Sequence, residues 1–193
     1  MFEELLSRIA LVLLRHNVPY IVTGGAALLL YGEPKLVRDI DVLIGLDARC
    51  INLLISIVRE MGLSPVPEDA REYIRQNMVL PAIDEASSIR VDFILSLTPY
   101  EAQAIKRTVK LRINDQRVCF ASCEDLIIHK ILSGAPPDII DMQKLVARHR
   151  GSIDGAYVRK WLREFDASFG KGEFMKTFES AYKGDSLPPI SFF

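Results

Sequence analysis

Two carboxylates, Asp39 and Asp41, stand two residues apart in the apolar stretch VRDIDVLI (37–44). In an extended strand these two side chains project from one face, while Ile40 and Val42 point to the other face, toward the core. Two carboxylates side by side repel each other, and burying both without a cation is costly. Mg²⁺ prefers hard oxygen ligands and is usually held by one or two carboxylates together with substrate phosphates. The pair therefore predicts a site for Mg²⁺, or for Mn²⁺ in its place.

Gly24 and Gly25 lie between an expected strand, Tyr20 to Thr23, and a short apolar helix. A glycine turn lets the backbone approach a ligand closely, and the amide groups at the start of a helix attract anions. A triphosphate held at this turn, beside a metal on the two carboxylates, describes a site for nucleotidyl transfer. In the loop that follows, Lys35 and Arg38 are candidates for phosphate contacts, with ordinary solvated charges as the alternative.

The Gly-Gly pair, the thirteen residues after it and the sequence Asp-Ile-Asp-Val together resemble the signature of the DNA polymerase β-type nucleotidyltransferase superfamily. The resemblance implies metal-dependent transfer of a nucleoside monophosphate from an NTP, the co-substrate, to an acceptor hydroxyl. Asp39 and Asp41 would be catalytic metal ligands, and Gly24 and Gly25 would cradle the triphosphate. The alternative is a glycine turn beside a solvent-facing edge strand.

A further carboxylate, Asp92, interrupts the apolar strand expected from Ile89 to Leu95. The superfamily uses a third carboxylate on a later strand of the same sheet. The resemblance thus implies that Asp92 is catalytic, either as a metal ligand or as the general base on the attacking hydroxyl. Arg90 shares its face and would neutralise this carboxylate or hold a phosphate. The alternative is that Asp92 simply faces solvent on one side of the sheet.

The segment SCEDLIIHKILSGAPPDIIDMQKLV (122–146) resembles part of the bacterial AbiEii-like nucleotidyltransferases, many of which are toxins of toxin–antitoxin pairs. The resemblance implies that Lys130 is catalytic and binds nucleotide phosphate. It also implies that Asp138 faces the active site and contacts the nucleotide, and that Asp141 caps a helix or forms a pair. The segment departs from the family at residues 135–137, where a basic residue is common and none stands. The alternatives are a snorkelling helix lysine for Lys130 and an N-cap for Asp138.

The composition is that of a folded, soluble protein, since 49% of the 193 residues are hydrophobic and 25% are charged. A formal net charge of −1 provides no overall attraction to nucleic acid. Three cysteines form no paired framework and no zinc motif, so they are expected to be reduced thiols of a cytoplasmic protein. The apolar runs are far shorter than the roughly 20 residues of a membrane span, and no signal peptide is recognisable, so no membrane partner is expected.

The two resemblances, together with the order of the patterned segments, imply an α/β (α+β) fold. A small mixed β-sheet nucleotidyltransferase core with helices packed on it would be followed by a helical C-terminal part. Residues 1–121 would form the catalytic core, and residues 122–193 would complete the cleft. Strands are expected at 20–23, around Asp39 and Asp41 with its end at Ile44, and at 78–83, 89–95, 109–113 and 117–121. Helices are expected at 2–16, 47–61, 68–75, 98–107, 122–133 and 138–150, with one more after Asp154 and another after Gly170, and a turn or loop is expected at 64–67.

The acceptor stays open at this stage. An RNA 3′ end such as that of tRNA, a protein hydroxyl and a small molecule such as an aminoglycoside all need the same catalytic core. If the chain is a toxin, an antitoxin is an expected partner. A function of another class, a nucleotide-binding or regulatory module with little turnover, is favoured by the missing basic residue near Pro136. The intact set of Asp39, Asp41 and Asp92 argues against it.

Overall fold

The computed structural model describes residues 1–34, 36–169 and 172–184. The chain forms two compact units. The first comprises Met1–Ala27 and Lys35–Ala121, and the second comprises Leu28–Pro34 and Ser122–Phe193. A short N-terminal segment, 28–34, thus belongs with the C-terminal part of the chain.

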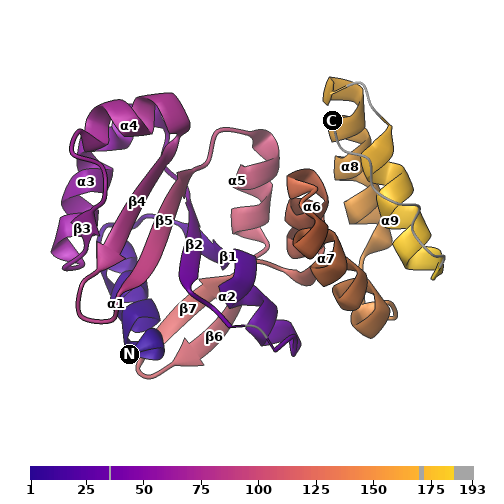
Figure 1. Cartoon of the computed structure of the whole chain (residues 1–193), viewed down its shortest axis with the longest axis horizontal. Helices are drawn as coiled ribbons and strands as arrows, with labels where there is room; N and C mark the ends of the chain where they lie inside the picture. Colours follow the sequence, from indigo (N-terminus) through magenta and orange to yellow (C-terminus); the bar gives the residue numbers. More distant parts are fainter. Residues whose placement is uncertain (35, 170–171, 185–193) are drawn as a thin grey trace. The chain divides into compact units, whose positions relative to one another are not determined.

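The first unit contains a mixed sheet in which the described residues form seven strands in the order β3-β4-β5-β2-β1-β7-β6 (Figure 1). Two pairs are parallel, β2 with β5 and β1 with β7, and the remaining neighbours are antiparallel. This confirms the predicted mixed sheet of an α/β fold. The strands are β1 (Tyr20–Thr23), β2 (Asp39–Ile44), β3 (Ser64–Pro65), β4 (Val79–Asp84), β5 (Ile89–Leu95), β6 (Val109–Ile113) and β7 (Gln116–Phe120).

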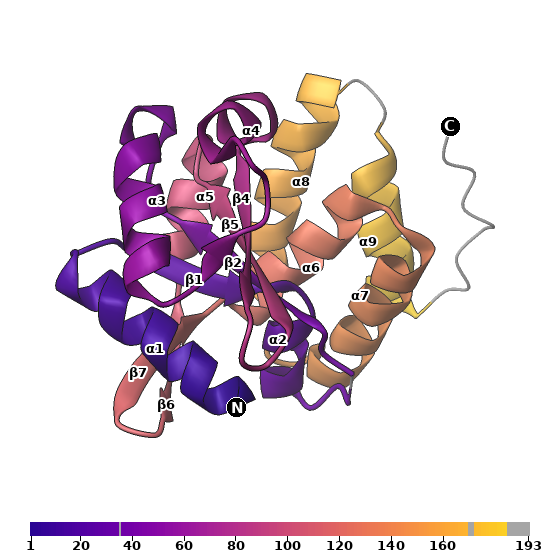
Figure 2. The same ribbon diagram turned by 60° about the vertical axis from the view of Figure 1, so that its left-hand side comes forward.

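Helices α1 and α3 contact each other and cover one face of this sheet (Figure 2). Both have apolar side chains at helical spacing, among them the fully buried Ile9, Leu13, Leu54 and Ile57. Burial of these side chains against the strands holds the sheet rigidly, so residues on its other face have a fixed support. The helical elements of this unit are α1 (Phe2–Arg15), α2 (Gly24–Leu28), the 3-10 turn η2 (Ala48–Cys50), α3 (Ile51–Glu60), α4 (Ala70–Asn77) and α5 (Pro99–Lys106).

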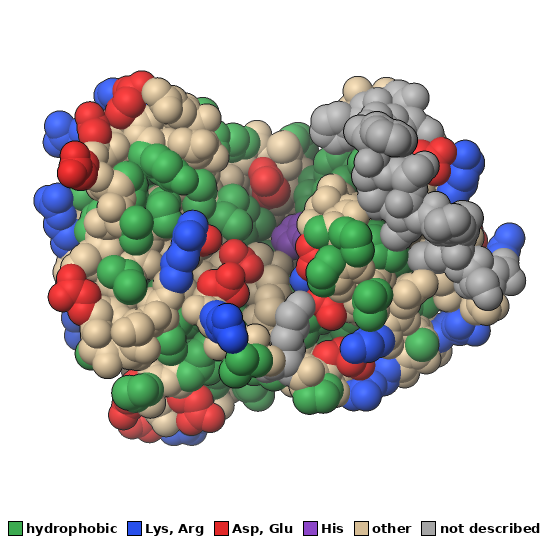
Figure 3. Space-filling model, viewed as in Figure 1, with side chains coloured by type: hydrophobic (Ala, Val, Ile, Leu, Met, Phe, Trp, Pro, Cys, Tyr) green, Lys and Arg blue, Asp and Glu red, His purple; other side chains and the backbone are tan. Residues whose placement is uncertain are grey.

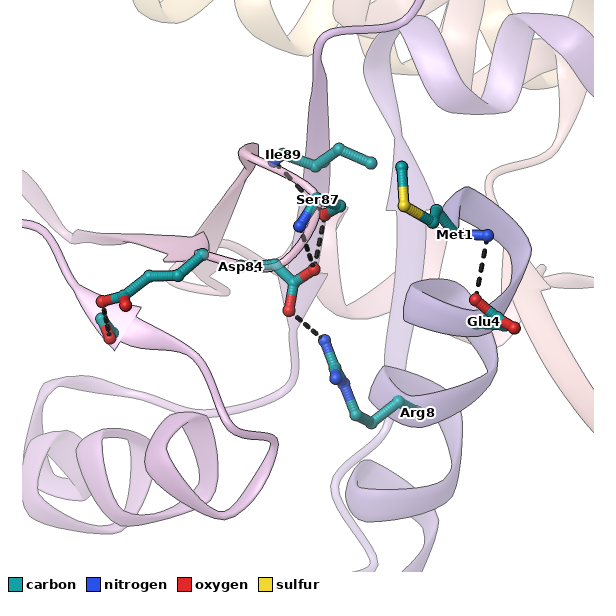
Figure 4. A network of polar contacts seen from close by, with 8 residues as sticks. Met1, Glu4, Arg8, Asp84, Ser87 and Ile89 are labelled. Carbon is teal, nitrogen blue, oxygen red and sulfur yellow. Dashed lines mark hydrogen bonds and ion pairs between the residues drawn. The ribbon is translucent and has the colours of Figure 1, made fainter.

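A polar network ties α1 to the turn that joins β4 and β5 (Figure 4). The buried carboxylate of Asp84 forms an ion pair with Arg8 and accepts a hydrogen bond of 3.2 Å from the amide of Ser87. Burial alone would raise the pKa of Asp84, but the hydrogen bonds from Ser87 and Arg8 outweigh it and lower that pKa. The network fixes the hairpin whose second strand is β5.

The second unit is helical, with η1 (Leu29–Tyr31), α6 (Cys123–Ser133), α7 (Pro136–His149), α8 (Gly155–Phe169) and α9 (Glu173–Lys183). Ser122 caps α6 by accepting a hydrogen bond of 3.1 Å from the amide of Asp125, as its sequence predicts. The Asp125 carboxylate is fully buried and accepts a hydrogen bond of 2.8 Å from the hydroxyl of Tyr157 on α8. The segment 28–34 is held against α7, where His149 lies 3.1 Å from the carbonyl oxygen of Tyr31.

Several of the predicted element boundaries are wrong. Helix α4 begins after its N-cap Asp69 and spans Ala70–Asn77 rather than 68–75. Ser64–Pro65 forms the short edge strand β3 rather than a turn or loop, because the outer edge of β4 offers unpaired backbone groups and proline is tolerated at a sheet edge. Helix α7 begins at Pro136, two residues before the expected start, since proline fits the first helical turn, and Ala135 is its N-cap. The alternative that Asp138 is an N-cap is therefore wrong as well.

No helix within residues 1–34, 36–169 and 172–184 has the length and apolar character that a bilayer crossing requires. This agrees with the short apolar runs of the sequence.

Candidate active site

The pairing of β2 with β5 brings the predicted carboxylates together. Asp41 lies opposite Asp92, and Asp39 lies opposite Arg90. Residues opposite each other on neighbouring strands project from the same face, so the three carboxylates share one face with Arg90. We call Asp39, Asp41 and Asp92 the carboxylate cluster. Asp39 is exposed and the other two are half-buried, and Figure 3 shows acidic side chains at the surface over this part of the sheet with basic ones beside them.

The opposite face of the same two strands is apolar. Ile40, Val42, Val91 and Phe93 are all completely buried there. Strong burial on one face fixes the register of both strands, because a slip by one residue would turn every one of these side chains toward solvent. The apolar alternation therefore also fixes which face carries the carboxylates.

The first glycine of the pair lies against the Asp41 carboxylate. Gly24 has a φ of +61°, and a Cβ placed on it would overlap Oδ2 of Asp41 and lie 2.9 Å from its Cγ. Only glycine tolerates both the left-handed backbone and this close approach. The neighbouring Thr23, a buried residue at the end of β1, lies opposite Asp41 in the sheet. The sequence pattern did not single out Thr23; its signal would have been a polar residue closing a fully buried strand.

Arg90 neutralises part of the charge of the cluster, as one of its two predicted roles requires. Its Nε donates a hydrogen bond of 2.7 Å to Oδ1 of Asp92. This bond, with a further contribution from the charge of Asp39, raises the pKa of the guanidinium. The Arg90 side chain is 53% exposed and that of Asp92 is 20% exposed, so the pair lies at the surface of the sheet.

The second unit contains the other predicted site residues. The Lys130 ammonium is buried, forms an ion pair with Asp138 and lies 3.3 Å from Oδ2 of Asp141. We call Lys130, Asp138 and Asp141 the lysine cluster. A snorkelling lysine would keep its ammonium in water, so that alternative for Lys130 is wrong. Asp141 forms a pair, as expected, whereas the roles of Lys130 and Asp138 toward a nucleotide stay predictions.

Two basic residues of the loop before β2 were candidates for phosphate contacts. Arg38 is exposed and directly precedes Asp39, the first residue of β2. Its role toward a phosphate stays a prediction. Lys35 lies outside the described residues.

Residues 2–183 match the protein family described as "Nucleotidyltransferase of unknown function (DUF6036)". The chain belongs to this nucleotidyltransferase family. This confirms the predicted class, whereas the closer resemblance to AbiEii-like proteins stays a prediction. No curated protein sequence matches the chain.

Several solved structures share the fold of this nucleotidyltransferase. An antigenic nucleotidyltransferase-like protein from Paracoccidioides brasiliensis superposes with a TM-score of 0.55 at 18% identity, over 96% of this chain and 94% of that one. The antibiotic-resistance factor ANT(2'')-Ia gives a TM-score of 0.57 at 17% identity, over 94% and 93%. The lincosamide antibiotic adenylyltransferase LnuA with bound lincomycin gives 0.50 at 17% identity, over 74% and 94%. At these identities the likeness establishes the fold.

The chemistry of the carboxylate cluster suits a hard divalent cation. Asp39 and Asp41 offer carboxylate oxygens from one face of β2, and the backbone at Gly24 leaves room beside Asp41 that a side chain would fill. Within the described parts of the nucleotidyltransferase chain, no group of three or more His, Cys, Asp or Glu side chains is arranged to hold a metal ion. Asp92 is bonded to Arg90 in this arrangement. The predicted metal-ligand roles of Asp39, Asp41 and Asp92 therefore stay predictions.

Proposed function

We propose that this nucleotidyltransferase moves a nucleoside monophosphate from an NTP to an acceptor hydroxyl with the help of Mg²⁺ or Mn²⁺. The observation that carries the proposal is the register of β2 and β5, which aligns Asp41 with Asp92 beside the open backbone of Gly24. Three carboxylates gathered at a half-exposed site destabilise the fold by mutual repulsion. Such an arrangement has a chemical use when a cation and a polyphosphate bind to it.

The residues of the cluster have distinct roles in this proposal. Asp39 and Asp41 hold the divalent cation, which when bound neutralises charge on the phosphates of the NTP. Asp92 accepts the proton of the acceptor hydroxyl as that oxygen attacks the α-phosphorus, and pyrophosphate leaves. The backbone at Gly24 lies against Asp41, and together with Gly25 it would border the phosphates.

The resemblance to AbiEii-like proteins supports further nucleotide contacts. Lys130 and Arg38 would bind phosphate oxygens as cations, and Asp138 would contact the nucleotide. The same resemblance supports a cytoplasmic toxin that a partner antitoxin controls. Induced expression of the wild-type chain and of the Asp41→Ala variant tests this role, because a nucleotidyl-transfer toxin stops growth only with Asp41 in place.

The acceptor that we propose to test first is the hydroxyl of a small molecule. One structure of ANT(2'')-Ia, with a TM-score of 0.51 at 18% identity over 94% of this chain and 97% of that one, contains adenylyl-2''-tobramycin. The LnuA structure contains lincomycin. Both proteins have folds similar to that of this chain, and both structures contain a small molecule. RNA 3′ ends and protein hydroxyls are the other acceptor classes.

The test is transfer of label from each of four α-labelled NTPs in the presence of Mg²⁺ or Mn²⁺. Aminoglycosides, lincosamides, total RNA and a cell lysate serve as separate acceptors. We expect label in one acceptor class with the wild-type protein and at least about 10³-fold less with the Asp39→Ala/Asp41→Ala variant. The matched control is Asp115→Ala, which removes a carboxylate that is 94% exposed on the β6–β7 turn. Equal label with and without Asp39 and Asp41 would refute the proposal.

A nucleotide-binding module with little turnover is the second candidate function. It is favoured by the Arg90–Asp92 ion pair, which occupies the proposed general base, and by the lack of a basic residue at 135–137. Metal-dependent NTP binding in a calorimeter, with no label in any acceptor, is the result expected for this candidate. Absence of both label and binding would exclude both functions.

A further inference from the structure

On the exposed face of β2 and β5, Arg90 lies among the three carboxylates of the cluster. Arg90 is bonded to Asp92 through Nε at 2.7 Å and lies opposite Asp39 on the neighbouring strand. The charges of the four side chains therefore do not balance, and a net charge of about −2 remains when all of them are ionised at neutral pH. Arg90 reduces the repulsion within the carboxylate cluster without removing it.

Stability alone is a weak reason for this arrangement. An ion pair in which one partner is 53% exposed contributes little to the free energy of folding. The guanidinium nevertheless interacts with two carboxylates of the cluster, since the hydrogen bond to Asp92 and the charge of Asp39 both raise its pKa. A divalent cation on Asp39 and Asp41 binds beside Arg90 and is repelled by the charge of its guanidinium.

We propose that Arg90 is the internal counter-cation of the carboxylate cluster, which holds Asp92 until a metal–nucleotide complex displaces it and then binds phosphate oxygens of that nucleotide. The proposal rests on the proposed function, because it assigns Arg90 a role at the same site. The guanidinium is 53% exposed at the end of a flexible stem, and its planar donors match phosphate oxygens in pairs. A metal ion without nucleotide provides no phosphate for Arg90 to bind. The bare metal ion therefore binds to the cluster weakly.

The order of binding follows from this exchange. The cation binds together with its nucleotide, because the phosphates bind Arg90 while the metal binds Asp39 and Asp41. Arg90 is then a positioning residue for Asp92 in the free protein and a phosphate contact in the complex. Asp92 becomes available to the acceptor hydroxyl only after the nucleotide has bound.

The test measures binding of Mn²⁺ and Mg²⁺ to the full chain without nucleotide, by calorimetry or by Mn²⁺ resonance. Replacing the guanidinium with a neutral side chain in Arg90→Gln removes a positive charge next to the metal site. We expect the affinity for the bare metal to rise about tenfold at low ionic strength. We expect the KM for the NTP to rise more than kcat changes, because a phosphate contact is lost.

Three variants make this experiment specific. Arg112→Gln removes an exposed arginine of strand β6 that pairs with Asp115 of the following turn. Strand β6 is separated from β5 by β2, β1 and β7, so this variant should keep a metal affinity within twofold of wild type. Arg90→Lys keeps the charge, so its affinity for the bare metal should stay close to wild type, whereas its KM rises. Adding Asp41→Asn to Arg90→Gln should abolish the gain in metal affinity if the metal binds at the cluster.

A second measurement keeps the proposal testable if Arg90→Gln does not fold. The Nε–H resonance of Arg90 in the wild-type protein, assigned by its loss in Arg90→Lys, should shift with a metal–nucleotide complex and stay in place with the bare metal at the same concentration. A resonance that never moves, or equal metal affinity of Arg90→Gln and Arg112→Gln, overturns the inference. If label transfer depends on Asp41 while either of these results holds, only the role of Arg90 fails. If no metal binds to any variant even with an NTP present, the proposed function fails.

Discussion

The lysine cluster and the carboxylate cluster both hold carboxylates close together, but they differ in burial and in how far a cation neutralises them. In the lysine cluster, the Lys130 side chain is 9% exposed, and those of Asp138 and Asp141 are 24% and 12% exposed. One ammonium serves two carboxylates there, and the hydroxyl of Ser133 donates a further hydrogen bond to Asp138. In the carboxylate cluster, one guanidinium is bonded to Asp92 and feels the charge of Asp39, and Asp39 is exposed to solvent.

The two clusters differ in how much unbalanced negative charge they expose to solvent. A buried ion pair tolerates little excess charge, because each unpaired charge in the interior costs several kcal/mol. A surface cluster tolerates excess negative charge, since water and ions screen it until a cation binds. We therefore expect the carboxylate cluster to determine activity with little effect on stability, and the lysine cluster to contribute strongly to stability.

The largest effect is expected when the carboxylate cluster loses Asp41. Asp41→Asn should lower nucleotidyl transfer by about 10³-fold, because it removes a proposed metal ligand. Its free energy of unfolding should stay equal or rise, since one of three mutually repelling charges is gone. Label transfer and urea denaturation measure the two quantities. An Asp41→Asn variant that keeps its activity and loses stability would show that the carboxylate cluster serves stability rather than activity.

Removal of the ammonium from the lysine cluster should have the largest effect on stability. Lys130→Met leaves Asp138 and Asp141 without this cation in a buried setting, so the free energy of unfolding should fall by about 3 kcal/mol. The single tryptophan, Trp161 on α8, reports the unfolding of the same unit in urea.

The matched control for Lys130→Met is Lys176→Met on α9. Lys176 is 72% exposed and lies 2.9 Å from Glu173, so its loss should cost less than about 0.5 kcal/mol. Restoring charge balance in Lys130→Met/Asp138→Asn should recover part of the lost stability. Equal stabilities of the two lysine variants would show that the lysine cluster is not structural.

The shape of the backbone beside the carboxylate cluster has an intermediate effect. Gly24→Ala places a Cβ on the Asp41 carboxylate in a backbone with a φ of +61°, so we expect a loss of about 2 kcal/mol together with most of the activity. Gly62→Ala is the control, because Gly62 has a φ of +72° with no atom within 4 Å of its Cβ position. That variant should lose about 1 kcal/mol and keep full activity. Equal losses of activity in both would contradict the role of the close approach.

A balanced ion pair within the first unit should behave like the lysine cluster, although with a smaller effect. Asp84→Asn breaks the buried pair with Arg8, and we expect a loss of about 1.5 kcal/mol at pH 7. The folded-state pKa of Asp84 is lowered, so this contribution is complete above the unfolded pKa of about 3.9 and is lost as the pH falls through the lower folded value.

Urea denaturation of wild type and Asp84→Asn between pH 7 and pH 3 checks this prediction. The difference between the two proteins should be constant from pH 7 to about pH 5 and should shrink below about pH 4. A difference that grows as the pH falls would mean that the pKa of Asp84 is raised in the folded protein. The Arg8 pair would then not stabilise the carboxylate.

The local features of the site follow from short stretches of the sequence. The alternation around Asp39 and Asp41 places both carboxylates on one face, and the burial of Ile40 and Val42 confirms this. Strand β1 and the cap at Ser122 also lie where the sequence places them. These features depend on side-chain alternation and on backbone groups only a few residues away, which a short stretch of sequence specifies.

Which side chains meet depends on how distant segments pair in the folded chain. The register that aligns Asp41 with Asp92 and Asp39 with Arg90 arises from hydrogen bonds between strands far apart in the sequence. The Lys130 pairs join the successive helices α6 and α7, and the short strand β3 forms because β4 offers an edge. Long-range pairings depend on the packing of the whole sheet and of the helical unit, so local periodicity carries no record of them.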